Sequence, residues 1–551
     1  MAKNEKNQTR RDFLKTAGIA GAAAAVSTIL PGCAGTSTTG TTGGGNAPAN
    51  WDYTSDVVVV GIGFAGLSSA ISAFDAGASV NIIEKAAAAY EGGNSRVCGQ
   101  CWIQPENVSD GKKYFLAMAN GHESDFTDAF VTTWATEMMN NATWMAAQLG
   151  KTPTTFPIFN PELPGLAGGT SIQCYIVGGA GNSILWKPLR AVAATKGIPV
   201  YNQKQAATLY TNGDGVVVGV GATDLVTLKT VNFKANKGVI LCSGGFEFNQ
   251  SLKQNNLQAP CFGMGSPYNT GDGLTMARPL GADYWHMNQC LGPIWFGYYN
   301  PKVDPSWPNN LYQLNVSNAD SVFIDAHGKR FVNEAKNDLH GKGFNEFFYF
   351  EANSVTEFYG YPRVPAWLVF GSAAAANPIV PGGTMGWTNL LGTYTWSKDN
   401  STEVTNGWVL KANDLPTLAA AMATQNLTTY PIAAPDPNMA ANMEAAINQY
   451  NTDAALTTPV DSVYGRTGIK ALTAPFYAIQ MSPGMVNTQG GPKRNEKAQI
   501  VDVNGTPIPH LFSSGELGSA YAWLYNGGGN VGECLAWGRI AAQNAVANAA
   551  V

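Results

Sequence analysis

The sequence is poor in charged residues and in histidine. Lysine, arginine, aspartate and glutamate make up 13% of the 551 residues, about half the usual share, and only 5 residues are histidine. The formal net charge is -5, and no basic stripe or zinc-finger spacing is present. Binding to a phosphate backbone needs clustered lysine and arginine, so nucleic acid is not an expected partner.

The 8 cysteines do not form a disulfide framework. Cys98 and Cys101 are the only close pair, and the sequence has neither a second CxxC nor a CxxCH haem motif. The pair fits two packed thiols or a redox dithiol, whereas an iron–sulfur centre would need distant cysteines as further ligands. We therefore expect packed thiols, with an iron–sulfur centre as the less favoured alternative and no metal site.

No long apolar run of the kind that spans a membrane is present. The Ala/Gly-rich stretch 16–30 follows Thr9-Arg10-Arg11-Asp12-Phe13-Leu14-Lys15, which is a twin-arginine pattern. Leu30-Pro31-Gly32-Cys33 is similar to a bacterial lipoprotein box, in which Cys33 carries lipid; the alternative is cleavage nearby that removes Cys33. Residues 1–33 are thus predicted to be an export signal, and the Gly/Ser/Thr-rich residues 34–50 a flexible linker between a lipid anchor and the rest of the chain.

Residues 56–85 (DVVVVGIGFAGLSSAISAFDAGASVNIIEK) have the pattern of a βαβ unit. Val57 to Val60 suit a central parallel strand, apolar residues then recur at helical spacing up to Phe74, and 80–83 predict a second strand. In the intervening GIGFAG turn, glycines allow a tight bend and close approach to a pyrophosphate at the helix N-terminus. Glu84 ends the second strand, where an acidic residue would bind an adenosine ribose. The unit therefore predicts dinucleotide binding.

Five further blocks follow in the order seen in one flavoprotein family. They are 91–95 (EGGNS), 237–246 (KGVILCSGGF), 269–277 (NTGDGLTMA), 322–334 (VFIDAHGKRFVNE) and 508–539, which contains SGE at 514–516 and GGGN at 527–530. With them the chain resembles soluble fumarate reductases, succinate dehydrogenase flavoprotein subunits, urocanate reductase and 3-ketosteroid dehydrogenases.

The resemblance implies an α/β, Rossmann-like FAD-binding domain of the glutathione-reductase type, discontinuous over 51–285 and 468–551. An α+β capping domain would be inserted at 286–467. Members with covalent flavin carry a histidine that is missing between 90 and 104 here, so FAD is expected to be noncovalent. The residues expected to contact it are Gly61, Gly63, Phe64, Ala65, Gly66, Glu84, Lys85, Gly92, Gly93, Asn94, Ser95, Gly244, Gly245, Asp272, Glu516, Gly528, Asn530 and Val531.

The cations with which fumarate and succinate enzymes hold two carboxylates are missing. The family's arginine after the NE pair falls on Asp338, its histidine before the TxGG turn on Asn487, and its arginine before GGN on Asn526. No histidine lies near 289–292. Because two anionic groups need matched cations, fumarate and succinate are not expected substrates.

Tyr525 and Gly529 have the spacing with which 3-ketosteroid dehydrogenases polarise a keto oxygen, and residues 159–165 (FNPELPG) also resemble those enzymes. Tyr525 would either do this or merely cap the flavin pocket. The tyrosine that acts as base in those dehydrogenases falls on Asp338. Asp338 and His340 are candidate acids, or else solvated surface residues.

These observations predict an extracytoplasmic FAD-dependent reductase of a conjugated C=C bond in a neutral or aromatic enone, enoate or lactone. Electrons would come from a membrane quinol-linked or multihaem cytochrome partner, since the chain has no haem motif, FMN domain or second nucleotide fingerprint. The alternatives are a 3-ketosteroid dehydrogenase and a surface flavoprotein that relays electrons without catalysing hydride transfer.

Overall fold

The computed structural model describes residues 45–551, apart from 177–182, 258–260, 292–294, 317, 336–349, 354–357, 384, 426–435 and 522. Cys33 and the two candidate acids Asp338 and His340 lie outside the described residues.

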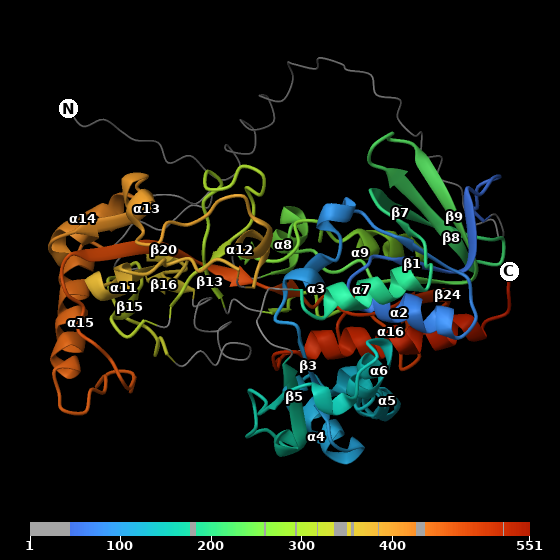
Figure 1. Ribbon diagram of the computed structural model, residues 1–551, viewed down its shortest axis with the longest axis horizontal. Helices are drawn as coiled ribbons and strands as arrows, with labels where there is room; N and C mark the ends of the chain where they lie inside the picture. The colour runs from blue at the N-terminus through green and yellow to red at the C-terminus, as the bar shows by residue number, and fades with distance from the viewer. Residues whose placement is uncertain are drawn as a thin grey trace, which may run out of the picture. The chain divides into compact units, whose positions relative to one another are not determined.

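The predicted βαβ unit is confirmed and forms the centre of the first sheet (Figure 1). Val57 to Val59 have no exposed surface, as a continuous apolar run in a doubly covered parallel strand requires. The strand order is β23-β24-β9-β1-β2-β6, and β7 and β8 extend the sheet through β9. Its strands are β1 (Tyr53–Val60), β2 (Val80–Ile83), β6 (Val200–Tyr201), β7 (Lys204–Thr211), β8 (Val217–Asp224), β9 (Thr230–Leu241), β23 (Gln499–Val501) and β24 (Pro507–Ser513).

Parallel pairing brings the C-terminal part of the chain to the first strand. β1 pairs in parallel with β2 on one side and with β9 on the other, and β9 pairs in parallel with β24. The helices α2 (Phe64–Asp75) and α16 (Gly529–Ala547) lie side by side against this sheet (Figure 1). The motifs near residue 60 and those near residue 515 therefore end at the same edge of one sheet.

A group of shorter elements packs beside α16 and forms one apolar core with it. Fully buried tryptophans, among them Trp102, Trp134 and Trp537, fill this core. Its elements are α3 (Gly93–Val97), α4 (Val108–Ala119), α5 (Asp128–Met138), α6 (Asn141–Gln148), α7 (Trp186–Thr195) and the three-stranded sheet of β3 (Cys101–Pro105), β5 (Ile172–Ile176) and β4 (Ile158–Phe159).

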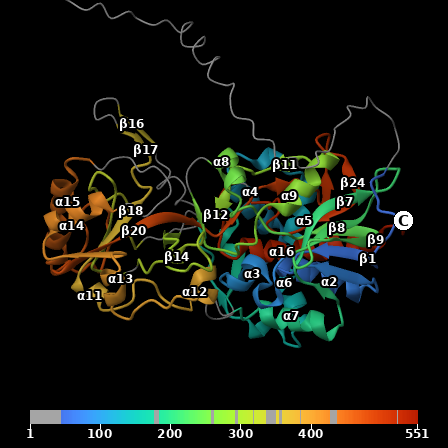
Figure 2. The same cartoon turned by 90° about the horizontal axis from the view of Figure 1, so that it is seen from above.

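A second sheet is built around the long strand β20 (Phe476–Met485), and Figure 2 shows it together with α14 and α15. Within the segment 286–467, the apolar run 366–370 forms the strand β18, and the run that begins at Leu415 forms the helix α14. Two strands of this sheet, β10 and β20, come from outside 286–467, so the division into domains at those limits stays a prediction. The elements are β10 (Phe262–Gly263), β13 (Trp295–Tyr298), β14 (Tyr312–Gln313), β15 (Ser321–Ile324), β18 (Ala366–Phe370), β19 (Val409–Ala412), α14 (Leu415–Thr424) and α15 (Met439–Ala454).

The other elements are short connections between these layers. They are α8 (Gln250–Asn256), α9 (Asp272–Ala277), β11 (Tyr284–Trp285), β12 (Cys290–Leu291), β16 (Glu351–Asn353), β17 (Phe358–Gly360), α11 (Ser372–Ala375), α12 (Trp387–Leu391), α13 (Ser401–Thr405), β21 (Asn487–Thr488) and β22 (Gly491–Pro492). Within the described ranges, every helix is too short or too polar to cross a membrane.

Candidate cofactor and active site

The glycines of the GIGFAG turn have different roles. Gly61 has φ +100°, and a Cβ there would meet the carbonyl oxygen of Cys242; a Cβ at Gly66 would meet the carbonyl oxygen of Gly61. Both glycines are therefore required by the fold itself. Gly63 has ordinary backbone angles, and its Cβ would reach only the Ser95 Oγ, at 3.0 Å. Gly63 precedes α2, whose first N–H, that of Phe64, donates to Ser95 Oγ (2.8 Å); a helix N-terminus of this kind suits an anion.

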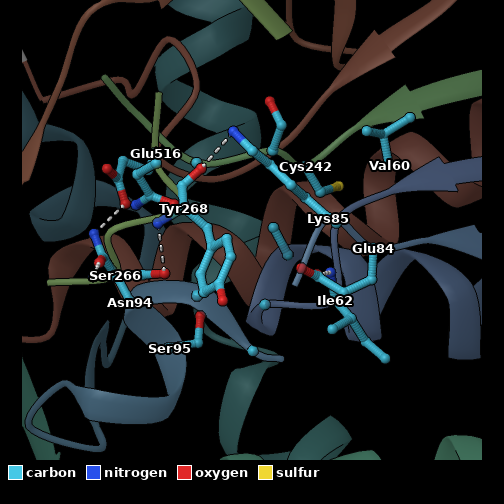
Figure 3. Close-up of a pocket in the computed structure, with 18 of the residues that line it drawn as sticks. Val60, Ile62, Glu84, Lys85, Asn94, Ser95, Cys242, Ser266, Tyr268 and Glu516 are labelled. Carbon is cyan, nitrogen blue, oxygen red and sulfur yellow. Dashed lines mark hydrogen bonds between the residues drawn. The ribbon is translucent and has the colours of Figure 1, made fainter. Parts of the chain in front are cut away.

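A large cavity that is open to solvent lies at the carboxyl ends of β1, β2 and β9. Twelve of the predicted FAD residues line it: Gly61, Gly63, Ala65, Glu84, Lys85, Gly92, Gly93, Asn94, Ser95, Gly244, Asp272 and Glu516. Figure 3 shows Glu84 and Ile62 on one side of this cavity and Glu516 and Asn94 on the other, with Lys85 and Tyr268 between them. The residues of five separate sequence blocks thus surround one elongated space.

Glu84 occupies the end next to the glycine turn. Its carboxylate accepts hydrogen bonds from the backbone N–H of Ile62 (3.1 Å) and of Ala86 (2.7 Å). Burial nevertheless raises the pKa of Glu84 to about 7, because the charged form loses its hydration. Beside it, Lys85 Nζ forms an ion pair of 2.9 Å with Asp272. A carboxylate and an ion pair at this end suit the hydroxyl groups of a ribose.

Asn94 organises the opposite end. Its Nδ2 donates to Glu516 Oε2 (3.0 Å) and to Glu247 Oε1 (2.7 Å), while its Oδ1 accepts from the N–H of Ser266 (2.7 Å). Asn94 also borders a second, smaller pocket, whose lining is mainly apolar and consists of Val97, Cys98, Met264, Gly265, Met385, Gly386 and Val486 besides Asn94 itself. The two cavities therefore share this asparagine.

Six of the predicted FAD residues do not line the large cavity. The Phe64 side chain is buried in the core, and Gly66 lies against the turn. Gly528 begins α16 with φ +86°, and the Asn530 amide donates to Gln489 Oε1 (3.2 Å). Gly245 and Val531 also lie outside the lining. For these six residues, contact with FAD stays a prediction.

Tyr525 is buried. The Tyr525 hydroxyl and the Gly529 N–H, the two donors expected to polarise a keto oxygen, both take part in hydrogen bonds within the protein. The Tyr525 hydroxyl oxygen accepts a hydrogen bond from the N–H of Asn530 (3.0 Å). The N–H of Gly529 donates to the carbonyl oxygen of Asn526 (2.9 Å), so in this structure it closes a turn and is not directed at a substrate oxygen. Burial raises the pKa of Tyr525 well above its usual range, which keeps the phenol protonated.

The FNPELPG segment holds this turn in place. Glu162 Oε2 accepts from the N–H of Gly527 (2.9 Å), and the N–H of Glu162 donates to Asn526 Oδ1 (2.8 Å). Tyr114, from α4, donates to the same Asn526 oxygen (2.9 Å). Asn526, at the position of the family's arginine, therefore anchors the turn that carries Tyr525 and contributes no positive charge.

The close cysteine pair is arranged differently from a CxxC dithiol. Cys101 on β3 lies beside Cys174 on β5, and the neighbouring Cys174 thiol is the main cause of the raised pKa of Cys101. Cys98 donates to the carbonyl oxygen of Ser95 (3.5 Å). In the part of the chain that the structure describes, no group of histidine, cysteine and carboxylate residues is suited to a metal ion.

The GKRFVNE block forms an ion network inside the protein. Arg330 donates to both carboxylate oxygens of Glu334 (Nε to Oε1 and Nη2 to Oε2, each 2.9 Å). It also donates to both carboxylate oxygens of Asp461 (2.7 and 3.0 Å), and all three side chains are buried. Arg466 contacts Glu334 as well, at 3.4 Å. Each of these buried charges has a partner, so the network ties the segment 330–334 to the segment 461–466 and leaves no unpaired charge among them.

Comparison with known proteins assigns the chain to a protein family. Residues 56–531 match the profile of the family described as FAD binding domain. The chain belongs to this family. It is an FAD-dependent oxidoreductase. Residues 7–27 separately match the twin-arginine translocation signal sequence, which supports export by that pathway.

Members and structural neighbours of this FAD-binding family match nearly the whole chain. The chain is 25% identical to 4-oxocyclohexanecarboxylate 2-dehydrogenase of Sinomonas cyclohexanicum, over 90% of this chain and 94% of that protein. It is 25% identical to digoxin reductase of Eggerthella lenta, over 98% of both chains. The structure of 3-ketosteroid delta1-dehydrogenase from Sterolibacterium denitrificans superimposes with a TM-score of 0.68 at 19% identity, covering 90% of this chain and 99% of that one, which shows the same fold.

The residues present fit FAD. The α2 N-terminus suits the pyrophosphate, Glu84 suits a ribose, and the cavity continues from there to Asn94 and Glu516. Sequence reasoning missed several lining residues, namely Lys204, Ala206, Ser266 and Tyr268. Ser266 and Tyr268 lie just before the NTGDG block, which could have indicated them. Lys204 and Ala206 on β7 belong to no motif.

Proposed function

We propose that the protein is an extracytoplasmic reductase of a conjugated C=C bond in a neutral or aromatic enone, enoate or lactone. The observation that carries this proposal is the replacement of dicarboxylate-binding cations by amides. Asn526 anchors a turn, and the buried Asn487 donates to the carbonyl oxygen of Thr488 (3.0 Å). Without matched cations the site does not favour fumarate or succinate.

The bound cofactor would supply the hydride chemistry, and the protein would position it and the substrate. Gly63 and the α2 N-terminus would hold the pyrophosphate, Glu84 the adenosine ribose, and Asn94 and Glu516 the far half of the molecule. The chain contains no histidine in the segment 90–104 to which flavin would be attached, which supports noncovalent FAD. The apolar cavity next to Asn94 suits an uncharged substrate.

Tyr525 would donate a hydrogen bond to the carbonyl oxygen of the substrate. Its phenol stays protonated in the buried site, and Glu162 and Asn526 hold the turn that carries it. A well-placed donor of this kind lowers the barrier by roughly 3–4 kcal/mol. Gly529 would join it only after its bond to the Asn526 carbonyl opens.

The test is reoxidation of a reduced viologen dye by purified protein in the presence of a panel of unsaturated compounds. We expect an enone, enoate or lactone to reoxidise the dye and fumarate to leave it reduced. A panel without any active unsaturated compound would contradict the proposal.

The second candidate is a 3-ketosteroid dehydrogenase, since Glu162 of the FNPELPG segment holds the Tyr525 turn. The similarity to 4-oxocyclohexanecarboxylate 2-dehydrogenase supports oxidation next to a ketone. In this case a saturated 3-ketosteroid should reduce an artificial electron acceptor, and a broad steroid set without turnover would argue against it.

The twin-arginine signal and the lipoprotein box support a location outside the cytoplasm on a lipid anchor. Electrons would then come from a membrane quinol-linked or multihaem cytochrome donor.

A further inference from the structure

Two glutamates from distant parts of the sequence meet at one end of the large cavity. Glu247 follows β9, and Glu516 follows β24. Because β9 and β24 are parallel neighbours, the loops after them leave the same edge of the sheet. A Cβ at Gly245 would meet Thr488 Oγ1, Glu516 Oε1 and Glu247 Oε2, so the two carboxyl oxygens and this hydroxyl lie against the same small residue. Glycine at 245 leaves the space in which the two carboxyl groups face each other.

The surrounding hydrogen bonds use one oxygen of each carboxyl group. Asn94 Nδ2 donates to Glu247 Oε1 (2.7 Å) and Glu516 Oε2 (3.0 Å), and Asn269 Nδ2 also donates to Glu247 Oε1 (3.2 Å). The remaining oxygens, Glu247 Oε2 and Glu516 Oε1, are buried and find no donor of good geometry among the described residues. One proton between them would satisfy both.

The electrostatics favour a single shared proton. Glu247 has no exposed surface, and burial raises the pKa of both carboxyl groups; the negative charge of Glu247 raises that of Glu516 further. The charged and titratable groups nearby are Lys253 of α8 and the Cys290 thiol of β12, on the side of Glu247, and the Cys534 thiol of α16, near Glu516. Lys253 Nζ donates to the carbonyl oxygen of Cys261 (3.0 Å), and within the described residues neither glutamate forms an ion pair with a cation.

We propose that Glu247 and Glu516 form a proton site coupled to cofactor binding: they share one proton while FAD is bound, and loss of that proton weakens the binding of FAD. This rests on the proposed placement of FAD in the large cavity. Glu516 lines that cavity, so FAD would displace the water that could solvate two adjacent carboxylates. Above the upper pKa of the free pair, binding would therefore take up one proton.

The consequence is a pH dependence of FAD affinity on the alkaline side. Where binding is coupled to the uptake of one proton, the dissociation constant rises about tenfold per pH unit. Glu84 lies in the same cavity and has a pKa of about 7, so the measurement belongs above about pH 8, where Glu84 is already ionised.

The experiment is FAD release from the holoenzyme, followed by FAD fluorescence over this pH range, for the wild type, Glu247→Gln and the exposed control Glu444→Gln. A glutamine amide replaces the shared proton as a donor to Glu516, so Glu247→Gln should bind FAD with an affinity that does not change with pH. The wild type and the control should lose affinity about tenfold per pH unit. A wild-type pH profile in Glu247→Gln would overturn the proposal.

A second measurement covers variants that fail to fold. FAD added to wild-type apoprotein in weak buffer with an indicator dye should take up one proton per FAD at alkaline pH, and absence of uptake would overturn the proposal. Gly63→Ala distinguishes an error in the placement of FAD from an error in the proton site. If FAD does not lie in this cavity, Gly63→Ala and Glu247→Gln both bind FAD as the wild type does; if only the proton site is wrong, Gly63→Ala alone loses FAD.

Discussion

Arg494 and Glu533 form an ion pair that is completely shielded from solvent, and Arg494→Met tests what this pair contributes. Glu533 also accepts hydrogen bonds from Ser519 Oγ (2.6 Å) and the N–H of Ala520 (2.8 Å). Arg494 donates to the carbonyl oxygens of Leu517 (3.1 Å) and Gly515 (3.3 Å). The pair therefore joins α16 to the loop on both sides of Glu516.

Arg494→Met leaves Glu533 in the interior without its cation. Removing one partner of such a pair costs about 3–5 kcal/mol, and two carbonyl groups also lose their donors. Burial already raises the pKa of Glu533, and loss of the arginine raises it further. A carboxyl whose folded-state pKa is raised contributes stability at low pH and loses it as the pH rises, so the variant should be weakest at alkaline pH.

Denaturant-induced unfolding measures this cost, and the FAD content of the purified protein measures its effect on the cavity. The matched control is the double variant Arg494→Met with Glu533→Met, which leaves no unpaired charge and should recover most of the lost free energy. A single variant that loses less than about 1 kcal/mol, or a double variant no more stable than the single one, would refute the reasoning.

Further predictions concern the cofactor and the anchor. Burial raises the folded-state pKa of Glu84 to about 7, so as the pH rises from the unfolded-state pKa of a glutamate to 7, the wild type should lose about 3 kcal/mol of stability. Glu84→Gln should abolish this contribution, and unfolding curves measured across pH test it. Gly63→Ala should fold normally yet purify without FAD, whereas Gly66→Ala should be destabilised because its Cβ meets a backbone carbonyl. Thermal unfolding and FAD absorbance distinguish the two variants. A Gly63→Ala protein fully loaded with FAD would contradict the placement of the pyrophosphate. Acid precipitation of the wild type should leave intact FAD in the supernatant, and flavin in the pellet would show a covalent bond. Cys33→Ser should shift the exported protein from the membrane to the soluble fraction, and an unchanged distribution would argue against lipidation.

The sequence alone determined the family, the βαβ unit and half of the residues that line the cavity. These features depend on local patterns: four consecutive valines bury a strand on both faces, glycines at fixed spacing form the turn, and Glu84 follows at the end of the next strand. Each pattern lies within about 30 residues, where the periodicity of side chains decides the structure. The resemblance then joined these segments in the correct order.

Only the tertiary structure decided which side chains from distant segments meet. Asn94 and Glu516 are 422 residues apart, Glu162 and Asn526 are 364 apart, and Cys101 lies beside Cys174 of another strand. Glu247 stands in no functional motif, and its role follows from the parallel pairing of β9 and β24. Likewise, the bond from Gly529 to the Asn526 carbonyl depends on how the turn closes. Such contacts are set by strand order and by competition for hydrogen-bond partners in the folded interior, and neither leaves a periodic signal in the sequence.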